Sequence, residues 1–304
     1  TRITSGVVGA LIVLLLLTLP QPIPLILIAL AWLFCLWEFI WVTGVRPYAI
    51  IGAVIAVLLV FYYFGRFVLL AINSHPHLLS LELKNLLQGW TSRWETNLVL
   101  FLVMLLLGLF LILTFRRGAK VIELSWVGLV AVLNITYPFF TLAVLSFVAN
   151  SSAFLILVLG LAWVGDVSAI FAGKAFGKIH VTPALSPGKT IEGLIGGIAG
   201  TAVYLLAVGA FYRSGIMTVP QELAEVFMLG NPIAFALGWL LIGIAIALVG
   251  FFGDLTVSAV KRIYKKKDTG TFLPGHGGLW DRVDSLLFIA PLVMLLLSLY
   301  SAFK

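Results

Sequence analysis

Acidic, basic and glycine residues gather in two segments of the C-terminal half of this chain. Residues 166–193 read DVSAIFAGKAFGKIHVTPALSPGKTIEG, and residues 254–285 include DLTVSAVKR and KDTGTFLPGHGGLWDRVDS. Carboxylates suit Mg²⁺, which usually takes one or two of them together with substrate phosphates. Lysine, arginine and glycine-rich backbone bind phosphate. The combination predicts chemistry on highly charged phosphates, which depends mainly on positioning and charge neutralisation.

Asp254 is the clearest candidate in the second segment, because it lies near the end of a long apolar run. An ionised side chain at the centre of a bilayer costs at least about 2.5 kcal/mol, so such a residue normally faces a cavity, a partner or an ion. In a helix, Asp254, Ser258 and Lys261 share one face. The alternative is a structural pair between Asp254 and Lys261 at the helix end. We favour a functional role.

Asp281 and Asp284 lie three residues apart at the start of the last apolar run, where both could face one site. We predict a metal-binding role for Asp281. For Asp284, helix N-capping together with Ser285 is an equally good interpretation. The glycine-rich loop before them can bring backbone N–H groups close to a phosphate, and its candidate phosphate-binding residues are His276, Gly277 and Gly278.

The first segment contains SPGKT, which resembles the end of a P-loop. A Walker motif needs glycine where this chain has Pro183, and it needs a preceding strand that we do not expect here, so an ATPase is excluded. Ser186, Lys189 and Thr190 still offer phosphate-binding groups at the start of the next helix. Asp166 lies in an apolar run, and the energetic argument made for Asp254 applies to it as well.

The elements that position these residues are membrane-spanning helices. The 304 residues are 62% hydrophobic and 10% charged, whereas an ordinary soluble domain is about 25% charged. Continuous apolar runs exclude soluble, disordered and fibrous proteins, and also outer-membrane barrels, whose strands alternate. In lipid such runs must be helical. We predict an all-α polytopic protein with about nine spans, at residues 6–19, 22–43, 47–72, 97–115, 121–149, 152–173, 191–212, 232–260 and 284–303.

The distribution of charge predicts an orientation for these spans. With the N-terminus inside, 14 of the 19 basic residues fall in inner loops, which indicates N-in and C-out. The net charge of +7 therefore reflects membrane topology, and we expect no nucleic-acid partner. We predict a scaffold or dimer surface from residues 1–120 and a catalytic region from residues 121–304, with cytoplasmic loops at 174–190 and 261–283.

Two local patterns predict helix geometry. Gly193 with Gly197, and Gly196 with Gly200, form small-x-x-x-small pairs that favour close helix packing. Pro138 is expected to kink the fifth apolar run.

Residues 258–284, SAVKRIYKKKDTGTFLPGHGGLWDRVD, resemble the signature of the CDP-diacylglycerol synthase (phosphatidate cytidylyltransferase) family, and GKAFGK through SPGKTIEGLIGG is similar to a second block of it. The resemblance implies transfer of CMP from CTP to phosphatidate, which yields CDP-diacylglycerol and pyrophosphate for phospholipid biosynthesis. It implies Mg²⁺, with a monovalent cation such as K⁺ as a second ion. It also implies a homodimer in the bacterial cytoplasmic (inner) membrane, with its site facing the cytoplasm.

The paired-metal centre of the family maps onto Asp254 and Asp281, and we expect Asp268 and Asp284 to be further ligands or their neighbours. The phosphate of phosphatidate, largely dianionic because its second pKa is near 6, can attack CTP without a strong base. The expected charge-neutralising residues are Lys189, Lys261, Arg262 and Arg282. The expected substrate-binding residues are Ser186, Lys189, Thr190, Ser258, His276, Gly277 and Gly278.

Two other function classes compete with this interpretation. A secondary transporter of an anionic solute would also use intramembrane acids, but it often shows inverted repeats with a site at the midplane. This chain shows no such symmetry. A CDP-alcohol phosphotransferase would need a D-G-x-x-A-R array, which is absent, and a lipid kinase remains as another phosphotransfer enzyme.

Overall fold

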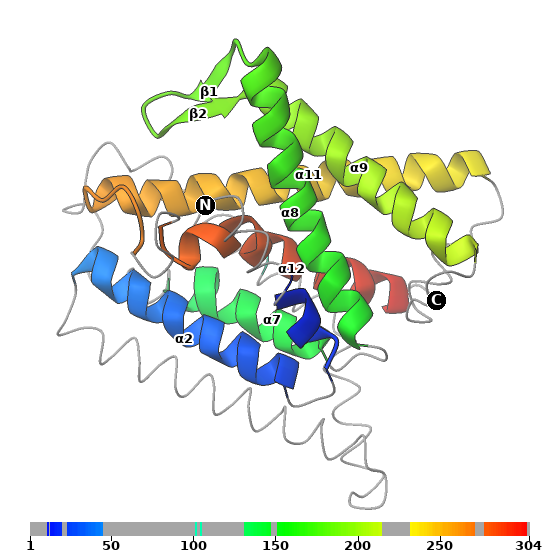
Figure 1. The fold of residues 1–304 in the computed structure, drawn as a ribbon, viewed down its shortest axis with the longest axis horizontal. Coiled ribbons are helices and arrows are strands. Elements are labelled where there is room, and N and C mark those ends of the chain that lie inside the picture. The colour runs from blue at the N-terminus through cyan, green and yellow to red at the C-terminus, as the bar shows by residue number, and fades with distance from the viewer. Residues whose placement is uncertain are drawn as a thin grey trace, which may run out of the picture.

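The computed structural model describes residues 11, 13–19, 23–44, 101, 104, 131–146, 151–214, 232–270 and 277–302. The predicted span at 47–72 and most of the one at 97–115 lie outside these residues. The described part is mostly helical (Figure 1), and its elements are α2 (Ile23–Thr43), η3 (Val132–Thr136), α7 (Tyr137–Leu145), α8 (Ser151–Phe176), β1 (His180–Thr182), β2 (Ser186–Thr190), α9 (Ile191–Arg213), α11 (Pro232–Ile263) and α12 (Trp280–Ala302).

Five of the described helices are long and apolar enough to cross a membrane. These segments are Ile23–Thr43, Leu155–Phe176, Ile191–Tyr212, Leu237–Ile263 and Trp280–Leu299. The last of them, in α12, is 72% buried, whereas the others are buried by 39% or less. Helix α12 is therefore the centre of the bundle, with α11 on one side of it and α7 and α2 on the other (Figure 1).

Helix α2 has an outer face and an inner face of different composition. Its exposed side chains include Leu30, Leu33 and Trp37, spaced along one stripe, while Cys35 and Glu38 are fully buried. An apolar outer stripe is what lipid contact requires, because lipid cannot solvate polar groups. The same contrast holds on α8, α9 and α11, where large apolar side chains are also exposed.

The fifth predicted span contains an irregular helix. Its described part begins with the π-helical turn η3 and continues as α7, with Pro138 in the first turn of α7. Proline lacks the N–H that would continue a regular helix. The helix changes from π- to α-helical geometry just before this proline, and the kink expected there stays a prediction.

Helices α8 and α9 pack closely along their small residues, as predicted. A Cβ atom at Gly196 would overlap Ala172, and one at Gly200 would overlap Ser168. Gly197 faces the backbone of Gly165, where the carbonyl oxygen would lie 3.3 Å from an added Cβ. The absence of side chains on α9 thus sets the distance between these two helices.

One element departs from the all-α prediction. Residues 180–190, expected as a loop, form an antiparallel hairpin in which His180 pairs with Thr190 and Thr182 pairs with Ser186. The Leu185 N–H donates to the Thr182 carbonyl at 3.0 Å, so residues 182–185 form a tight turn with Pro183 in the position that proline favours. The segment SPGKT is therefore strand β2, which leads directly into α9.

The ends of several elements come together. The C-terminal ends of α2 and α11 and the N-terminal end of α12 lie at the left of Figure 1, with the hairpin above them. The hairpin and the ends of α11 and α12 carry most of the charged residues that the sequence analysis singled out.

Candidate active site

Three aspartates from three helices form the first part of the site, which we call the acidic cluster: Asp166 of α8, Asp254 of α11 and Asp284 of α12. Asp284 is only 7% exposed and interacts electrostatically with the other two carboxylates. Asp166 Oδ2 accepts a hydrogen bond from Ser285 Oγ at 2.7 Å, and Asp254 Oδ1 accepts one from Ser258 Oγ at 3.4 Å. Carboxylates that repel one another in this way favour a neighbouring cation.

Lys189 of β2 is the cation that the structure places against this cluster. Its Nζ forms an ion pair with Asp254 Oδ2 and lies 5.0 Å from the centre of the Phe251 ring. Burial alone would lower the pKa of Lys189, but the adjacent Asp254 carboxylate outweighs that effect and raises it above the usual lysine value. Lys189 therefore remains charged at neutral pH, and the cluster holds three carboxylates against one ammonium group.

The hairpin that carries Lys189 contacts α9 through the residue that follows Lys189 and contacts α11 through a residue that precedes it. The neighbouring Thr190 is the N-cap of α9, and its Oγ1 accepts a hydrogen bond from Gly193 N at 3.1 Å. Arg262 of α11 donates from Nε to the Leu185 carbonyl at 3.3 Å and from Nη1 to the Lys266 carbonyl at 3.1 Å. Arg262, expected to neutralise phosphate, thus also joins the hairpin to the end of α11.

The second part of the site, which we call the loop anchor, consists of Glu38, Lys261, Thr269 and Asp281. Asp281 Oδ1 accepts from Lys261 Nζ at 2.6 Å. Its Oδ2 accepts from Thr269 N at 2.8 Å and from Gly278 N at 3.3 Å. The Thr269 hydroxyl lies 2.9 Å from this Oδ2 and also 2.9 Å from Glu38 Oε2. The anchor joins both ends of the glycine-rich loop to α2.

The structure decides between interpretations that the sequence left open. The structural pair between Asp254 and Lys261 does not form, because Asp254 pairs with Lys189 and Lys261 pairs with Asp281. The N-cap interpretation of Asp284 is wrong, because α12 already begins at Trp280. Asp284 lies in the second turn of that helix and belongs to the acidic cluster.

The remaining predicted residues lie around these two centres. Gly277 has a φ of +82°, a backbone conformation that glycine adopts without strain, and a Cβ at Gly278 would overlap Thr269 and Glu38. Asp268 and Arg282 are exposed, and Ser186 is half-buried in β2. His276 lies outside the described residues.

The donor chemistry of the two centres fits Mg²⁺. Among the described residues, no three His, Cys, Asp or Glu side chains converge closely enough to hold a metal ion on their own. Mg²⁺ does not require such a cage, because it keeps several waters and usually takes one or two carboxylates with substrate phosphates. Asp254 and Asp281 each supply a carboxylate whose present partner is a lysine.

Two residues of the site were missed or left open by the sequence analysis. Asp166 was noted but received no role, and Glu38 was not considered. Glu38 is an ionisable residue inside the apolar run at 22–43, so the signal that identified Asp254 was present there too. The neighbouring Cys35 of α2 interacts electrostatically with Glu38, Asp281 and Asp284, which places this face of α2 beside both centres.

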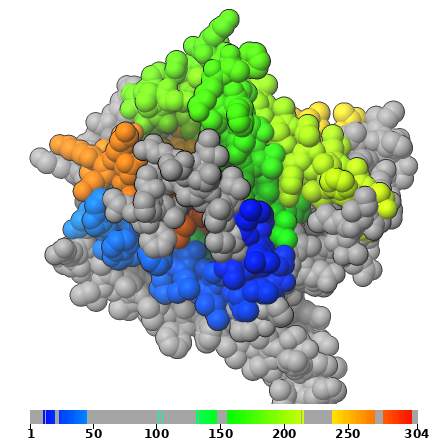
Figure 2. Space-filling model, viewed as in Figure 1, coloured from blue at the N-terminus to red at the C-terminus, as the bar shows by residue number. Residues whose placement is uncertain are grey.

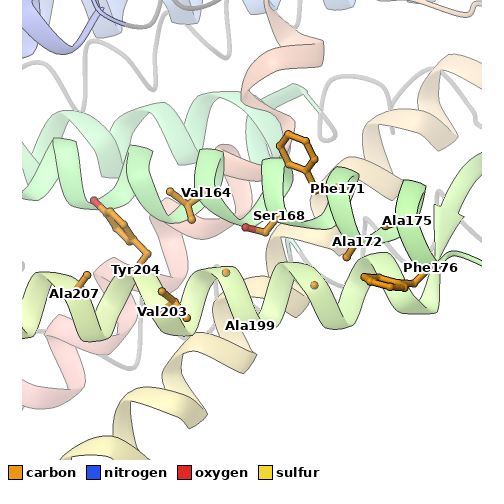
Figure 3. Close-up of a pocket in the computed structure, with 12 residues that line it drawn as sticks. Val164, Ser168, Phe171, Ala172, Ala175, Phe176, Ala199, Val203, Tyr204 and Ala207 are labelled. Carbon is orange, nitrogen blue, oxygen red and sulfur yellow. The ribbon is translucent and has the colours of Figure 1, made fainter.

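The structure also has an apolar groove between α8 and α9, apart from the acidic cluster and the loop anchor (Figure 3). Among its lining residues are Val164, Ser168, Val203 and Tyr204, and none of the twelve is acidic or basic. Val164 and Ser168 each lie two positions from Asp166, and residues two apart do not share a helix face. The groove is therefore separate from the charged chemistry.

Comparison with known proteins identifies the family. The Cytidylyltransferase family matches residues 1–300. Phosphatidate cytidylyltransferases of Thermotoga maritima and Bacillus subtilis are 42% and 40% identical over 136 and 139 residues. The uncharacterized protein YnbB of Escherichia coli is 37% identical over 144 residues.

These alignments cover 45–47% of this chain and 42–46% of each relative, so the chain spans about half the length of the curated relatives it matches. The match over nearly all of the sequence confirms the resemblance, and the chain belongs to the cytidylyltransferase family.

Proposed function

We propose that this protein transfers CMP from CTP to phosphatidate, which yields CDP-diacylglycerol and pyrophosphate. The observation that carries the proposal is the pair of Asp–Lys contacts, Asp254 with Lys189 and Asp281 with Lys261, at the ends of apolar helices. Two relatives bear the name phosphatidate cytidylyltransferase, which supports this choice of substrates. A lipid substrate also explains why the charged groups lie between membrane-spanning helices.

The proposed reaction needs little proton transfer. A phosphate monoester is largely dianionic at neutral pH, so an oxygen of phosphatidate attacks the α-phosphorus of CTP directly. The bond between the α-phosphorus and the oxygen that bridges to the β-phosphorus breaks, and pyrophosphate leaves with that electron pair. The task of the protein is to hold two anions in line and to neutralise their repulsion.

Each lysine can change partner during substrate binding. Lys189 and Lys261 are held by carboxylates in this structure, and incoming phosphate oxygens offer them an equivalent anionic partner. Arg262 adds positive charge at the C-terminal end of α11, and Arg282 adds it at the N-terminal end of α12. The remaining predicted substrate-binding residues are Ser186, Thr190, Ser258, His276, Gly277 and Gly278.

Release of the lysines frees Asp254 and Asp281 to hold Mg²⁺, with Asp284 and Asp268 as additional or neighbouring carboxylates. Bound Mg²⁺ would supply Lewis-acid stabilisation of the charge on the reacting phosphates. A monovalent cation such as K⁺ is the proposed second ion, because the acidic cluster holds more carboxylates than one lysine neutralises.

The proposed membrane arrangement has about nine spans, N-in and C-out, in the bacterial cytoplasmic membrane, with the site facing the cytoplasm. The positive-inside distribution supports this orientation. So does the meeting of the C-terminal ends of α2 and α11 with the N-terminal end of α12 (Figure 1), since the predicted topology puts all three inside. We also propose a homodimer, with residues 1–120 contributing scaffold or dimer surface and residues 121–304 most of the catalytic residues.

Labelled CTP tests the activity. Purified protein receives phosphatidate, Mg²⁺ and CTP labelled on either the α- or the γ-phosphate. We expect the α-label in a CDP-lipid and the γ-label in pyrophosphate. Transfer of the γ-label to lipid would indicate a lipid kinase instead. Absence of any lipid product, with uptake of an anionic solute into vesicles that contain the protein, would favour the transporter. The matched control is Asp254→Asn.

A further inference from the structure

Glu38 of α2 is a fully buried carboxylate whose two oxygens both accept hydrogen bonds. Oε1 accepts from Leu279 N at 2.8 Å. Oε2 accepts from Trp280 N at 2.8 Å and lies 2.9 Å from the Thr269 hydroxyl. All three partners are more than 230 residues further along the chain and lie near the two ends of the glycine-rich loop.

These contacts give Glu38 two roles in one place. The N–H groups of Leu279 and Trp280 open helix α12, where unpaired donors and the helix dipole favour a negative charge. The Thr269 contact reaches the other end of the loop. One carboxylate thus connects the beginning of the loop, its end and the helix that carries Asp281.

The loop backbone lies directly against this carboxylate. An added Cβ at Gly270 would lie 2.7 Å from Glu38 Oε1, and one at Gly278 would overlap both Glu38 and Thr269. These two glycines therefore permit a close approach that any side chain would prevent. The two described ends of the loop thus lie directly against a residue of α2.

Aromatic contacts hold α2 against the same segment on either side of Glu38. Phe39 packs edge-to-face on Trp280 with 5.5 Å between ring centres. Lys266 Nζ lies 4.5 Å from the ring centre of Trp41. In Figure 2 the light-blue end of α2 lies beside the orange end of α11 and the residues that follow it.

We propose that Glu38 is a positioning residue for the reaction, and that it acts through Thr269 on Asp281. The Thr269 hydroxyl lies between the two carboxylates, and the Thr269 N–H donates to Asp281. Asp281 thereby presents its other oxygen, Oδ1, to Lys261. This inference rests on the proposed function, and it brings a residue of the N-terminal half into the catalytic machinery.

The kinetic test compares Glu38→Gln and Thr269→Val with the control Thr43→Val. Thr43 is also a buried residue of α2, but within the described part of the chain its hydroxyl donates to carbonyls of its own helix. Loss of a hydrogen bond to a charged group predicts that kcat falls about tenfold or more in each test variant. The apparent Mg²⁺ requirement should rise, while the KM for phosphatidate stays within about twofold, since the proposal has Glu38 act through Thr269 and Asp281 and not through contact with substrate.

The kcat of the double variant Glu38→Gln with Thr269→Val should be no lower than that of the less active single variant, because both substitutions remove the same connection from Glu38 through Thr269 to Asp281. The proposal would be overturned if the losses in kcat of the two single variants multiply in the double variant. It would also be overturned if Glu38→Gln keeps the kcat and the Mg²⁺ dependence of the wild type. If Glu38→Gln does not fold, Thr269→Val alone decides: an unchanged Mg²⁺ requirement in that variant contradicts the proposal.

A second readout does not depend on activity. Lys265 and Lys267 are exposed at the start of the loop, so trypsin cleavage after them reports how firmly the loop is held. We expect Glu38→Gln to be cleaved about tenfold faster than wild type and Thr43→Val to match wild type. Equal cleavage of Glu38→Gln and wild type would refute the positioning role. If the wild type forms no CDP-lipid, the proposed function fails, but the cleavage rates still test whether Glu38 holds the loop.

Discussion

The acidic cluster and the loop anchor are built from the same residue types but differ in how their charges are compensated. In the anchor, every carboxylate oxygen of Glu38 and Asp281 accepts at least one hydrogen bond from an ammonium, hydroxyl or backbone N–H group. In the cluster, Asp166, Asp254 and Asp284 share one lysine and a few serine contacts.

This difference separates two tasks. Carboxylates that accept hydrogen bonds on every oxygen hold a structure together, and removing one partner leaves buried groups uncompensated. Carboxylates that repel one another are available to a cation from outside. We infer that the cluster mainly serves ligand binding, and that the anchor mainly fixes the loop that leads into α12, whose first turn carries Asp281.

The largest effect is expected for Asp254→Asn. Loss of metal-assisted stabilisation should reduce CDP-lipid formation at least about a thousandfold. The substitution relieves repulsion with Asp166 and Asp284 but also removes the partner of Lys189, so the melting temperature in detergent without Mg²⁺ should fall less than in Asp281→Asn. Thermal melts with and without Mg²⁺ measure this. A fall in the melting temperature as large as that of Asp281→Asn would contradict the distinction between cluster and anchor.

Asp281→Asn should also abolish turnover, but it should destabilise the protein as well. The side chains of Lys261 and Asp281 are only 13% and 12% exposed, and breaking a buried pair by removing one partner costs about 3–5 kcal/mol. The measurement is unfolding in detergent, with Asp268→Asn as the control because Asp268 is exposed in the same loop. Equal stability of the two variants would show that the anchor is not structural.

Gly253→Ala tests the contact that brings the cluster together. An added Cβ would lie 2.7 Å from the Asp284 carbonyl oxygen and 2.8 Å from the Phe288 ring, so α11 and α12 would have to move apart. Overpacking of this kind costs about 1–3 kcal/mol, and activity should fall with stability. Gly188→Ala, with nothing within 4 Å of its added Cβ, should leave the melting temperature unchanged. Equal melting temperatures for both variants would contradict this packing.

The smallest effect concerns pH. The folded state raises the pKa of Lys189 because of Asp254, so the pair stabilises the protein fully below the unfolded lysine pKa of about 10.4 and loses that contribution as pH rises through the higher folded value. The difference in melting temperature between wild type and Lys189→Met should therefore be constant from about pH 6 to 9. A difference that shrinks within this range would mean that Lys189 loses its proton there.

The sequence predicted the chemistry of the site better than its geometry. Long apolar runs predicted membrane-spanning helices, and five of these are present among the described residues. The signature loop predicted the family, which the match over residues 1–300 confirms. The count of nine spans and the orientation stay predictions, as do the ligand roles of Asp254 and Asp281.

The hairpin and the choice of ion-pair partners could not be predicted in this way. SPGKT contains proline and glycine, which local propensity assigns to a loop, yet pairing with residues 180–182 makes it a strand. Helical spacing correctly put Asp254 and Lys261 on one face, but each found a closer partner on another element. Spacing within a helix predicts only which residues of that same helix are neighbours, not which residues of other elements lie closer.

Composition and the order of residues alone determined that this chain forms apolar helices and carries phosphate-binding chemistry at their ends. Both properties follow from side-chain hydrophobicity and charge, which each residue carries wherever it lies. Only the tertiary structure decided that Asp254 joins Asp166 and Asp284, that Lys189 reaches this cluster from a hairpin, and that Glu38 of α2 holds the distant loop. Such partnerships depend on distances between elements, and packing of whole helices sets those distances.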